Sequence, residues 1–156
     1  MQTWGIMVLR LVVGLVFVAH GLPKLLPIWG ASPARTAAMF EVVGLQPALI
    51  LVLAVGVVEL VGGAALFLGV FTRLVAIPLV IDMGVAIWKV HWSNGFFLNL
   101  ALEPDVQHGY EYALVLMGAL CCLIFAGPGA LSIDGYRAHV AKAAAATRAR
   151  LRRSKI

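Results

Sequence analysis

The chain has 156 residues, of which 62% are apolar and only 12% are charged, and its mean hydropathy is +0.99. Soluble domains usually carry about 45–50% apolar and about 25% charged residues, so this chain has too few polar side chains to coat a water-facing globule. The net charge of +5 comes mainly from the C-terminal tail, where seven of the twelve basic residues follow Asp134. That charge is a terminal tail rather than a nucleic-acid-binding face, and the composition predicts a fold embedded in the lipid bilayer.

Four long apolar segments occupy most of the chain, at residues 4–24, 48–71, 74–92 and 110–127. Each is close to the length of about 20 residues that a helix needs to cross a bilayer. Because a backbone in lipid must satisfy its own hydrogen bonds, all four are predicted to be helices. The sequence therefore predicts an all-α, polytopic membrane protein: a four-transmembrane-helix domain over residues 1–134 and a basic cytoplasmic tail over residues 135–156.

A shorter helix is predicted between the first two spans. Ser32 can cap its first turn, Pro33 suits its first position, and Gly44 with Pro47 ends it. Phe40 gives this segment an apolar side. The pattern indicates a short interfacial helix lying at the membrane surface.

The distribution of lysine and arginine predicts the orientation. The strongly basic tail is expected to stay in the cytoplasm, and four spans then place the N-terminus there as well. The loop that carries Glu103 and Asp105 falls outside. We therefore expect a multi-pass protein of the cell inner (plasma) membrane with both termini cytoplasmic.

Charged residues within the spans are costly, so they are expected to face the bundle interior and to pair. A rise of about 1.5 Å per residue places Glu59 and Asp82 roughly 15 Å deep, with Arg10 roughly 5 Å below them. These three residues form a predicted buried charge cluster in which Arg10 pairs with Glu59. A second, outer layer is predicted nearer the external surface: His20, Lys24, Lys89, His91 and Glu111.

The outer layer contains the candidate ligand-binding residues, His20, Lys24 and Glu111. Lys24 could donate to a ligand carbonyl while Glu111 holds it charged, or the two could simply bridge the first and fourth spans. Four aromatic residues border this layer and fit either the rim of a quinone site or an interfacial aromatic belt: Trp29, Trp92, Phe96 and Phe97.

Other chemistry finds less support in the residue pattern. His20 and His91 could be axial haem ligands, but His91 points about 180° from Asp82 on an ideal helix, which disfavours haem. The adjacent Cys121 and Cys122 lie in an apolar run without metal-ligand spacing. No metal cluster or nucleophile triad is present, so the sequence assigns no catalytic residue, and the cofactor is left open with a quinone as one option.

The order and spacing of these residues resemble the DoxX family of small membrane proteins over nearly all of residues 8–134. The first half of the resemblance rests on Arg10, His20-Gly21-x-x-Lys24, Glu59 with Gly62-Gly63, and Gly69-x-x-Thr72-Arg73. The second half rests on Asn94-Gly95-Phe96-Phe97, Glu111-Tyr112-Ala113-Leu114, Gly127-Pro128-Gly129, Ser132 and Asp134. Asp82 and Lys89 are not part of the family's pattern.

The resemblance implies a four-helix membrane bundle and a subunit or partner of a quinone-linked membrane redox system. It also leaves open a non-catalytic scaffold or chaperone that holds partner proteins, whereas a small transporter is disfavoured because no internal repeat is visible. The expected partners are the lipid bilayer and a protein in a membrane complex, with homo-oligomers left open and no nucleic acid. The polar positions that the resemblance marks as functional are Arg10, His20, Lys24, Glu59 and Glu111.

Overall fold

The computed structural model describes residues 2–102 and 106–153, and within these residues all regular secondary structure is helical. Glu103, Asp105 and Lys155, which contribute to the predicted orientation, lie outside the described residues. The α-helices are α1 (Gln2–Leu25), α2 (Pro33–Val42), α3 (Ala48–Leu68), α4 (Thr72–Ala86), α5 (Glu111–Ala126) and α6 (Ile133–Arg153). A π-helical turn, Ile87–His91, and a 3-10 turn, Trp92–Asn94, extend α4. The predicted all-α class is confirmed.

Three helical stretches of the described chain are long and apolar enough to cross a membrane: Thr3–Leu25, Ala48–Leu68 and Thr72–Asn94, with mean hydropathies of 2.1, 2.5 and 1.7. The fourth, Glu111–Ala126, is also apolar but has only 16 residues. A span usually needs at least about 17 residues. The structure therefore shows three candidate spans and one shorter apolar helix close to the predicted fourth segment.

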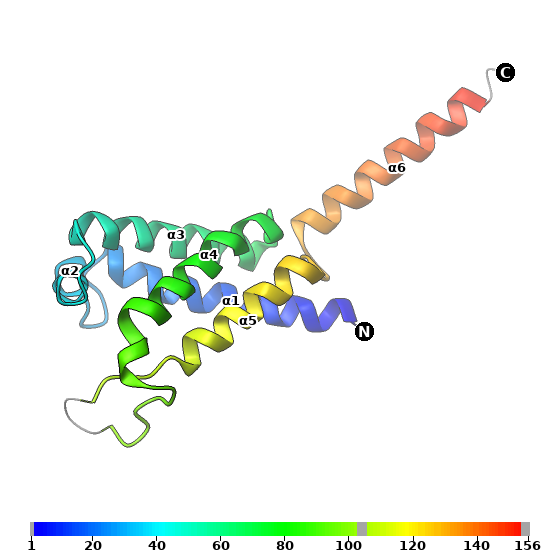
Figure 1. The fold of residues 1–156 in the computed structure, drawn as a ribbon. Coiled ribbons are helices and arrows are strands. Elements are labelled where there is room, and N and C mark those ends of the chain that lie inside the picture. Colours follow the sequence, from blue (N-terminus) through cyan, green and yellow to red (C-terminus); the bar gives the residue numbers. More distant parts are fainter. Residues whose placement is uncertain (1, 103–105, 154–156) are drawn as a thin grey trace.

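The helices α1, α3, α4 and α5 form a bundle, and different segments of the chain lie at its two ends (Figure 1). One end holds the N-terminus, the tight turn between α3 and α4, and the start of α6. The other end holds α2 and the loop between α4 and α5. Helix α6 projects away from the bundle. We call the end near the N-terminus the junction end and the other the loop end.

Glycines allow α1 and α3 to lie in close contact. A methyl group on Gly14 would come within 2.7 Å of the Gly63 carbonyl oxygen, and one on Gly21 within 2.6 Å of the Leu60 nitrogen. On the other side of the same interface, Gly63 and Gly56 have no room for a side chain either. Because small residues let helix backbones approach in lipid, this seam fixes the register between the two helices.

The short helix α2 forms as the sequence predicts. The Ser32 hydroxyl accepts the Arg35 N–H at 3.2 Å, Pro33 occupies the first turn, and Gly44 follows with φ of +74°. The buried Phe40 packs with Val52 of α3 in a small apolar cluster. Helix α2 is thereby held against the loop end of the bundle.

Candidate functional site

A cavity of about 680 Å³ lies between the helices toward the loop end. We call it the central cavity. All of α1 to α5 contribute to its wall, together with the loop before α5, and most of the lining side chains are apolar. Its polar lining is His20, Lys24, Glu59, Asp82, His91, Asn99, His108 and Tyr112. A largely apolar cavity of this size with a few convergent polar groups is typical of small-molecule sites.

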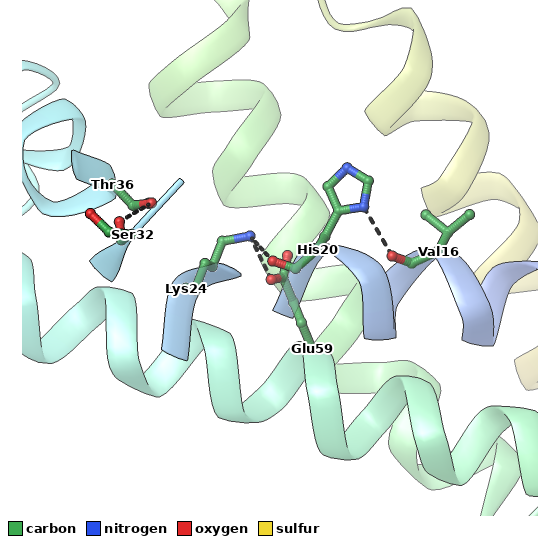
Figure 2. Close-up of polar contacts among 6 residues, drawn as sticks. All are labelled: Val16, His20, Lys24, Ser32, Thr36 and Glu59. Atoms are coloured by element: carbon green, nitrogen blue, oxygen red, sulfur yellow. Dashed lines mark hydrogen bonds and ion pairs between the residues drawn. The ribbon is translucent and has the colours of Figure 1, made fainter. Parts of the chain in front are cut away.

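Lys24 of α1 and Glu59 of α3 form an ion pair in the wall of this cavity (Figure 2). Lys24 Nζ lies 2.5 Å from Glu59 Oε2, and the two side chains are only 17% and 4% exposed. Lys24 Nζ also donates to the His20 carbonyl oxygen at 3.1 Å. The pair neutralises two buried charges that would each be costly alone.

Asp82 of α4 adds a second carboxyl group to this pair. Its side chain lies close to that of Glu59. Asp82 Oδ2 is buried and has no hydrogen-bond partner among the described residues. Lys24, Glu59 and Asp82 thus form a triad with more acceptors than donors.

His20 is one turn before Lys24, and its ring turns away from the Lys24–Glu59 pair (Figure 2). Its Nδ1 lies 2.9 Å from the Val16 carbonyl oxygen. A carbonyl only accepts, so Nδ1 carries the proton, and in the neutral imidazole Nε2 is an acceptor. The ring centre is 6.1 Å from that of Tyr112 on α5.

The predicted Arg10–Glu59 pair is wrong. The glycine seam places Glu59 beside Gly21, about 16 Å along the α1 axis from Arg10. Side chains on a helix also lean toward its N-terminus, so the Arg10 guanidinium lies farther from Glu59 while the Lys24 ammonium reaches back toward it. Lys24 therefore takes the place that the depth estimate gave to Arg10, and the predicted two layers do not hold.

Arg10 instead binds backbone at the junction end. Its Nη1 donates to the carbonyl oxygens of Leu66 and Phe67, at 2.8 and 2.6 Å. Its Nη2 donates to those of Ala130 and Leu131, at 3.4 and 3.1 Å. The side chain is 1% exposed. A cation here complements the free carbonyls at the C-terminus of α3 and ties them to the segment before α6.

Asp134 completes the same end from the first turn of α6. Its carboxylate accepts the N–H groups of Phe71 and Thr72, both at 2.9 Å, and so caps α4. Gly69, between α3 and α4, has φ of +69°, and a side chain there would meet Arg10 and Ser132. We call this arrangement of Arg10, Asp134 and the backbone between them the Arg10–Asp134 junction.

Glu111 does not face Lys24, contrary to prediction. It lies at the start of α5 and accepts the Leu98 N–H at 3.0 Å. The loop before α5 folds back on itself here, with further hydrogen bonds from Gly109 to Phe97 and from Tyr110 to Gly95. Glu111 thus holds this loop, and the bridge expected between the first and fourth spans is absent from the described chain.

The remaining outer-layer residues separate. Lys89 Nζ lies 4.1 Å from the centre of the Trp88 ring. His91 lines the cavity and contacts the His108 carbonyl oxygen through Nδ1 at 2.9 Å, although an ideal helix would point it away. The π-helical turn Ile87–His91 explains the difference, because it holds an extra residue and so rotates the end of the helix relative to an ideal α-helix.

None of the four predicted aromatic residues lines the cavity: Trp29 lies exposed between α1 and α2, and the other three lie around the loop before α5. Trp92 stacks on Tyr110 at 5.4 Å, and Phe96 packs edge-on against Phe97 and Tyr110. Three polar wall residues, Asn99, His108 and Tyr112, were not among the sequence candidates. Tyr112 lies within the Glu-Tyr-Ala-Leu motif, which was the one signal that could have marked it. In the part of the chain that the structure describes, no three His, Cys, Asp or Glu side chains are grouped to hold a metal ion.

Apolar helices of membrane-spanning length, a glycine seam and an ion pair buried inside the bundle define a multi-helix membrane protein. The family model for DoxX matches residues 5–92, and the chain belongs to the DoxX family. The family named from the sequence pattern is thereby confirmed. No solved structure matches the chain.

Three relatives are similar over most of their length. An uncharacterized membrane protein of Mycobacterium tuberculosis is 33% identical over 83% of this chain and 79% of its own. An uncharacterized protein of Haemophilus influenzae is 33% identical over 81% of this chain and 85% of its own. A Bacillus subtilis protein named "Putative oxidoreductase CatD" is 32% identical over 64% of this chain and 69% of its own.

Proposed function

We propose that this protein binds a quinone-type ligand in the central cavity and serves as a subunit or partner of a quinone-linked membrane redox system. The observation that carries the proposal is the cavity itself, which combines an apolar wall with the buried Lys24–Glu59–Asp82 triad. Apolar lining suits a substituted ring and its lipid tail, and the triad suits the ring oxygens. The oxidoreductase name of the Bacillus subtilis relative agrees with this role.

The proposed role is binding and positioning, with electrons exchanged through a partner protein in the same membrane. Lys24 and His20 lie on one turn of α1, so the ring would be held against α1 between α3 and α5. Glu111 supports the loop over the cavity without touching the ligand. Compared with the sequence hypothesis, the ligand residues become His20, Lys24, Glu59 and Asp82.

A photoreactive azidoquinone tests this proposal. After irradiation of the purified protein in mild detergent, mass spectrometry should find the label on peptides lining the cavity, including that of Met83. The variant Ala86→Phe, which fills the cavity from α4, should lose the label. If labelling is absent, or is unchanged in Ala86→Phe, the ligand proposal fails and a scaffold that holds partner proteins becomes the better account.

We also propose that α5 is a fourth span and that both termini are cytoplasmic. The N-terminus and the start of α6 lie at the same end of the bundle, as an even number of spans requires (Figure 1). The basic residues of α6 favour the cytoplasmic side for that end. The exposed position of α6 would let it contact anionic lipid there.

Single cysteines test the topology. In a background where Cys121 and Cys122 are replaced by alanine, Ser93→Cys should react with an impermeant thiol reagent added to intact cells. Thr147→Cys in α6 should react only after the cells are opened. Labelling of Thr147→Cys in intact cells would contradict the orientation.

A further inference from the structure

We propose that the central cavity selects the reduced, hydroxyl-bearing form of its ligand, a hydroquinone, over the quinone, and that Asp82 is the residue that makes this selection. This inference rests on the proposed function and names the ligand's oxidation state. It depends on the hydrogen-bonding groups that remain free on the cavity wall after the protein's own contacts are satisfied.

Lys24 has little left to offer a ligand. One of its N–H groups is taken by Glu59 Oε2 at 2.5 Å and a second by the His20 carbonyl oxygen at 3.1 Å. An ammonium group has three donors, so one remains. A quinone, whose ring oxygens only accept, could use that single donor and nothing else of the triad.

Asp82 instead offers a ligand a hydrogen-bond acceptor. Asp82 lines the cavity, and its buried Oδ2 has no hydrogen-bond partner among the described residues. A buried acceptor without a donor is costly, and a ligand hydroxyl that donates to it would recover that cost. A quinone carbonyl placed there would instead set two acceptors against each other.

A hydroquinone hydroxyl fits both groups at once. Its oxygen can accept the free Lys24 N–H while its proton is donated to Asp82, since a hydroxyl is both donor and acceptor. Nε2 of His20 adds a further acceptor, because its Nδ1 is already engaged by the Val16 carbonyl. The part of the cavity wall formed by the triad and His20 therefore binds ligand hydroxyl groups better than ligand carbonyl groups.

Sites that bond a ligand hydroxyl reject analogues lacking it strongly, because the buried polar groups are then left unpaired. We therefore expect tetramethylhydroquinone to bind at least tenfold more tightly than tetramethylbenzoquinone. The dimethyl ether of the hydroquinone, which keeps both oxygens but has no proton to donate, should bind as weakly as the quinone. Affinities are measured without oxygen, by equilibrium dialysis of the full chain in mild detergent.

Two variants assign the preference to Asp82. Asp82→Asn keeps the shape but adds an N–H donor, so the ratio of quinone to hydroquinone affinity should rise toward one. Glu41→Gln, a carboxyl-to-amide change on the exposed face of α2, should leave the ratio as in the parent. Should Asp82→Asn fail to fold, the three probes on the parent protein still decide whether a donated proton is required.

The outcomes separate this inference from the proposed function. Equal binding of hydroquinone and quinone to the parent, with both lost in Ala86→Phe, would overturn the selection and leave the cavity as a quinone site. A preference for hydroquinone that survives in Asp82→Asn would also overturn the role of Asp82. Binding of all three probes that is unchanged in Ala86→Phe would overturn the proposed function itself.

Discussion

The Arg10–Asp134 junction and the central cavity both hold buried charges, yet they differ in what those charges bind. At the junction, Arg10 and Asp134 are directed at backbone groups on helix ends and turns. In the wall of the cavity, charged side chains contact one another directly, and Asp82 Oδ2 is left without a donor. A buried charge that binds backbone is structural, whereas one facing a cavity is available to a ligand.

The comparison also reassigns residues within the family's pattern. Arg10, Gly69, Ser132 and Asp134 belong to the junction, where they join α3, α4 and α6. His20, Lys24 and Glu59 belong to the cavity. The pattern therefore falls into two groups, one that holds the junction together and one that forms the proposed ligand site, and mutations in the two groups should behave differently.

The largest loss of stability is expected at the junction. Arg10→Met leaves the carbonyl groups of Leu66, Phe67 and Leu131 without their charged donor, and bonds to charged groups contribute about 1.5–3 kcal/mol each. We expect the free energy of unfolding to fall by about 5 kcal/mol, measured by denaturant titration in mixed micelles. Arg73→Met, an exposed arginine at the same end, should change it by about 0.5 kcal/mol or less. Similar stability of the two variants would contradict the role of the junction.

A somewhat smaller loss is expected for Lys24→Met, which leaves Glu59 buried without its cation. Breaking one side of a buried pair typically costs about 3–5 kcal/mol, while replacing both sides by apolar residues is often close to neutral. The double variant Lys24→Met, Glu59→Leu should therefore be more stable than Lys24→Met alone. A double-mutant cycle measures this, and additive losses would show that the two side chains are not coupled.

The glycine seam that joins the two regions should respond to a single methyl group. Gly21→Ala places a carbon 2.6 Å from the Leu60 nitrogen, and such overpacking typically costs about 1–3 kcal/mol. Gly84→Ala on α4 meets no neighbouring atom within 4 Å and should leave stability unchanged or raise it by up to about 1 kcal/mol. Unfolding curves for the pair give the comparison, and a loss of equal size at both sites would argue against close contact of α1 with α3.

Local sequence signals predicted the helices well. The errors arose where the prediction depended on how one helix is aligned along another. Ser32, Pro33 and Gly44 defined α2 because capping and turn chemistry depend on neighbours in sequence. The Arg10–Glu59 pair failed because depth was counted from the ends of each span, whereas Gly14 and Gly21 set the actual offset of α1 against α3.

The other site errors have equally specific causes. His91 was assigned to the outside because one α-helical period was assumed through the π-helical turn Ile87–His91. Glu111 was assigned to Lys24 because the fold-back of the preceding loop toward Leu98 depends on contacts without a periodic pattern. Polar and charged side chains within a span are costly in lipid, and this can be recognised without knowing how the helices align. That signal alone marked the cavity residues His20, Lys24, Glu59 and Asp82.

The difference between the two regions is tested most directly by the change in melting temperature that tetramethylhydroquinone causes in the parent and in Ala86→Phe. A ligand at 100 times its Kd stabilises the protein that binds it by about 2.7 kcal/mol. The account predicts a clear rise for the parent and none for Ala86→Phe, whose junction is intact but whose cavity is filled. An equal rise in both proteins, or no rise in the folded parent, would contradict it.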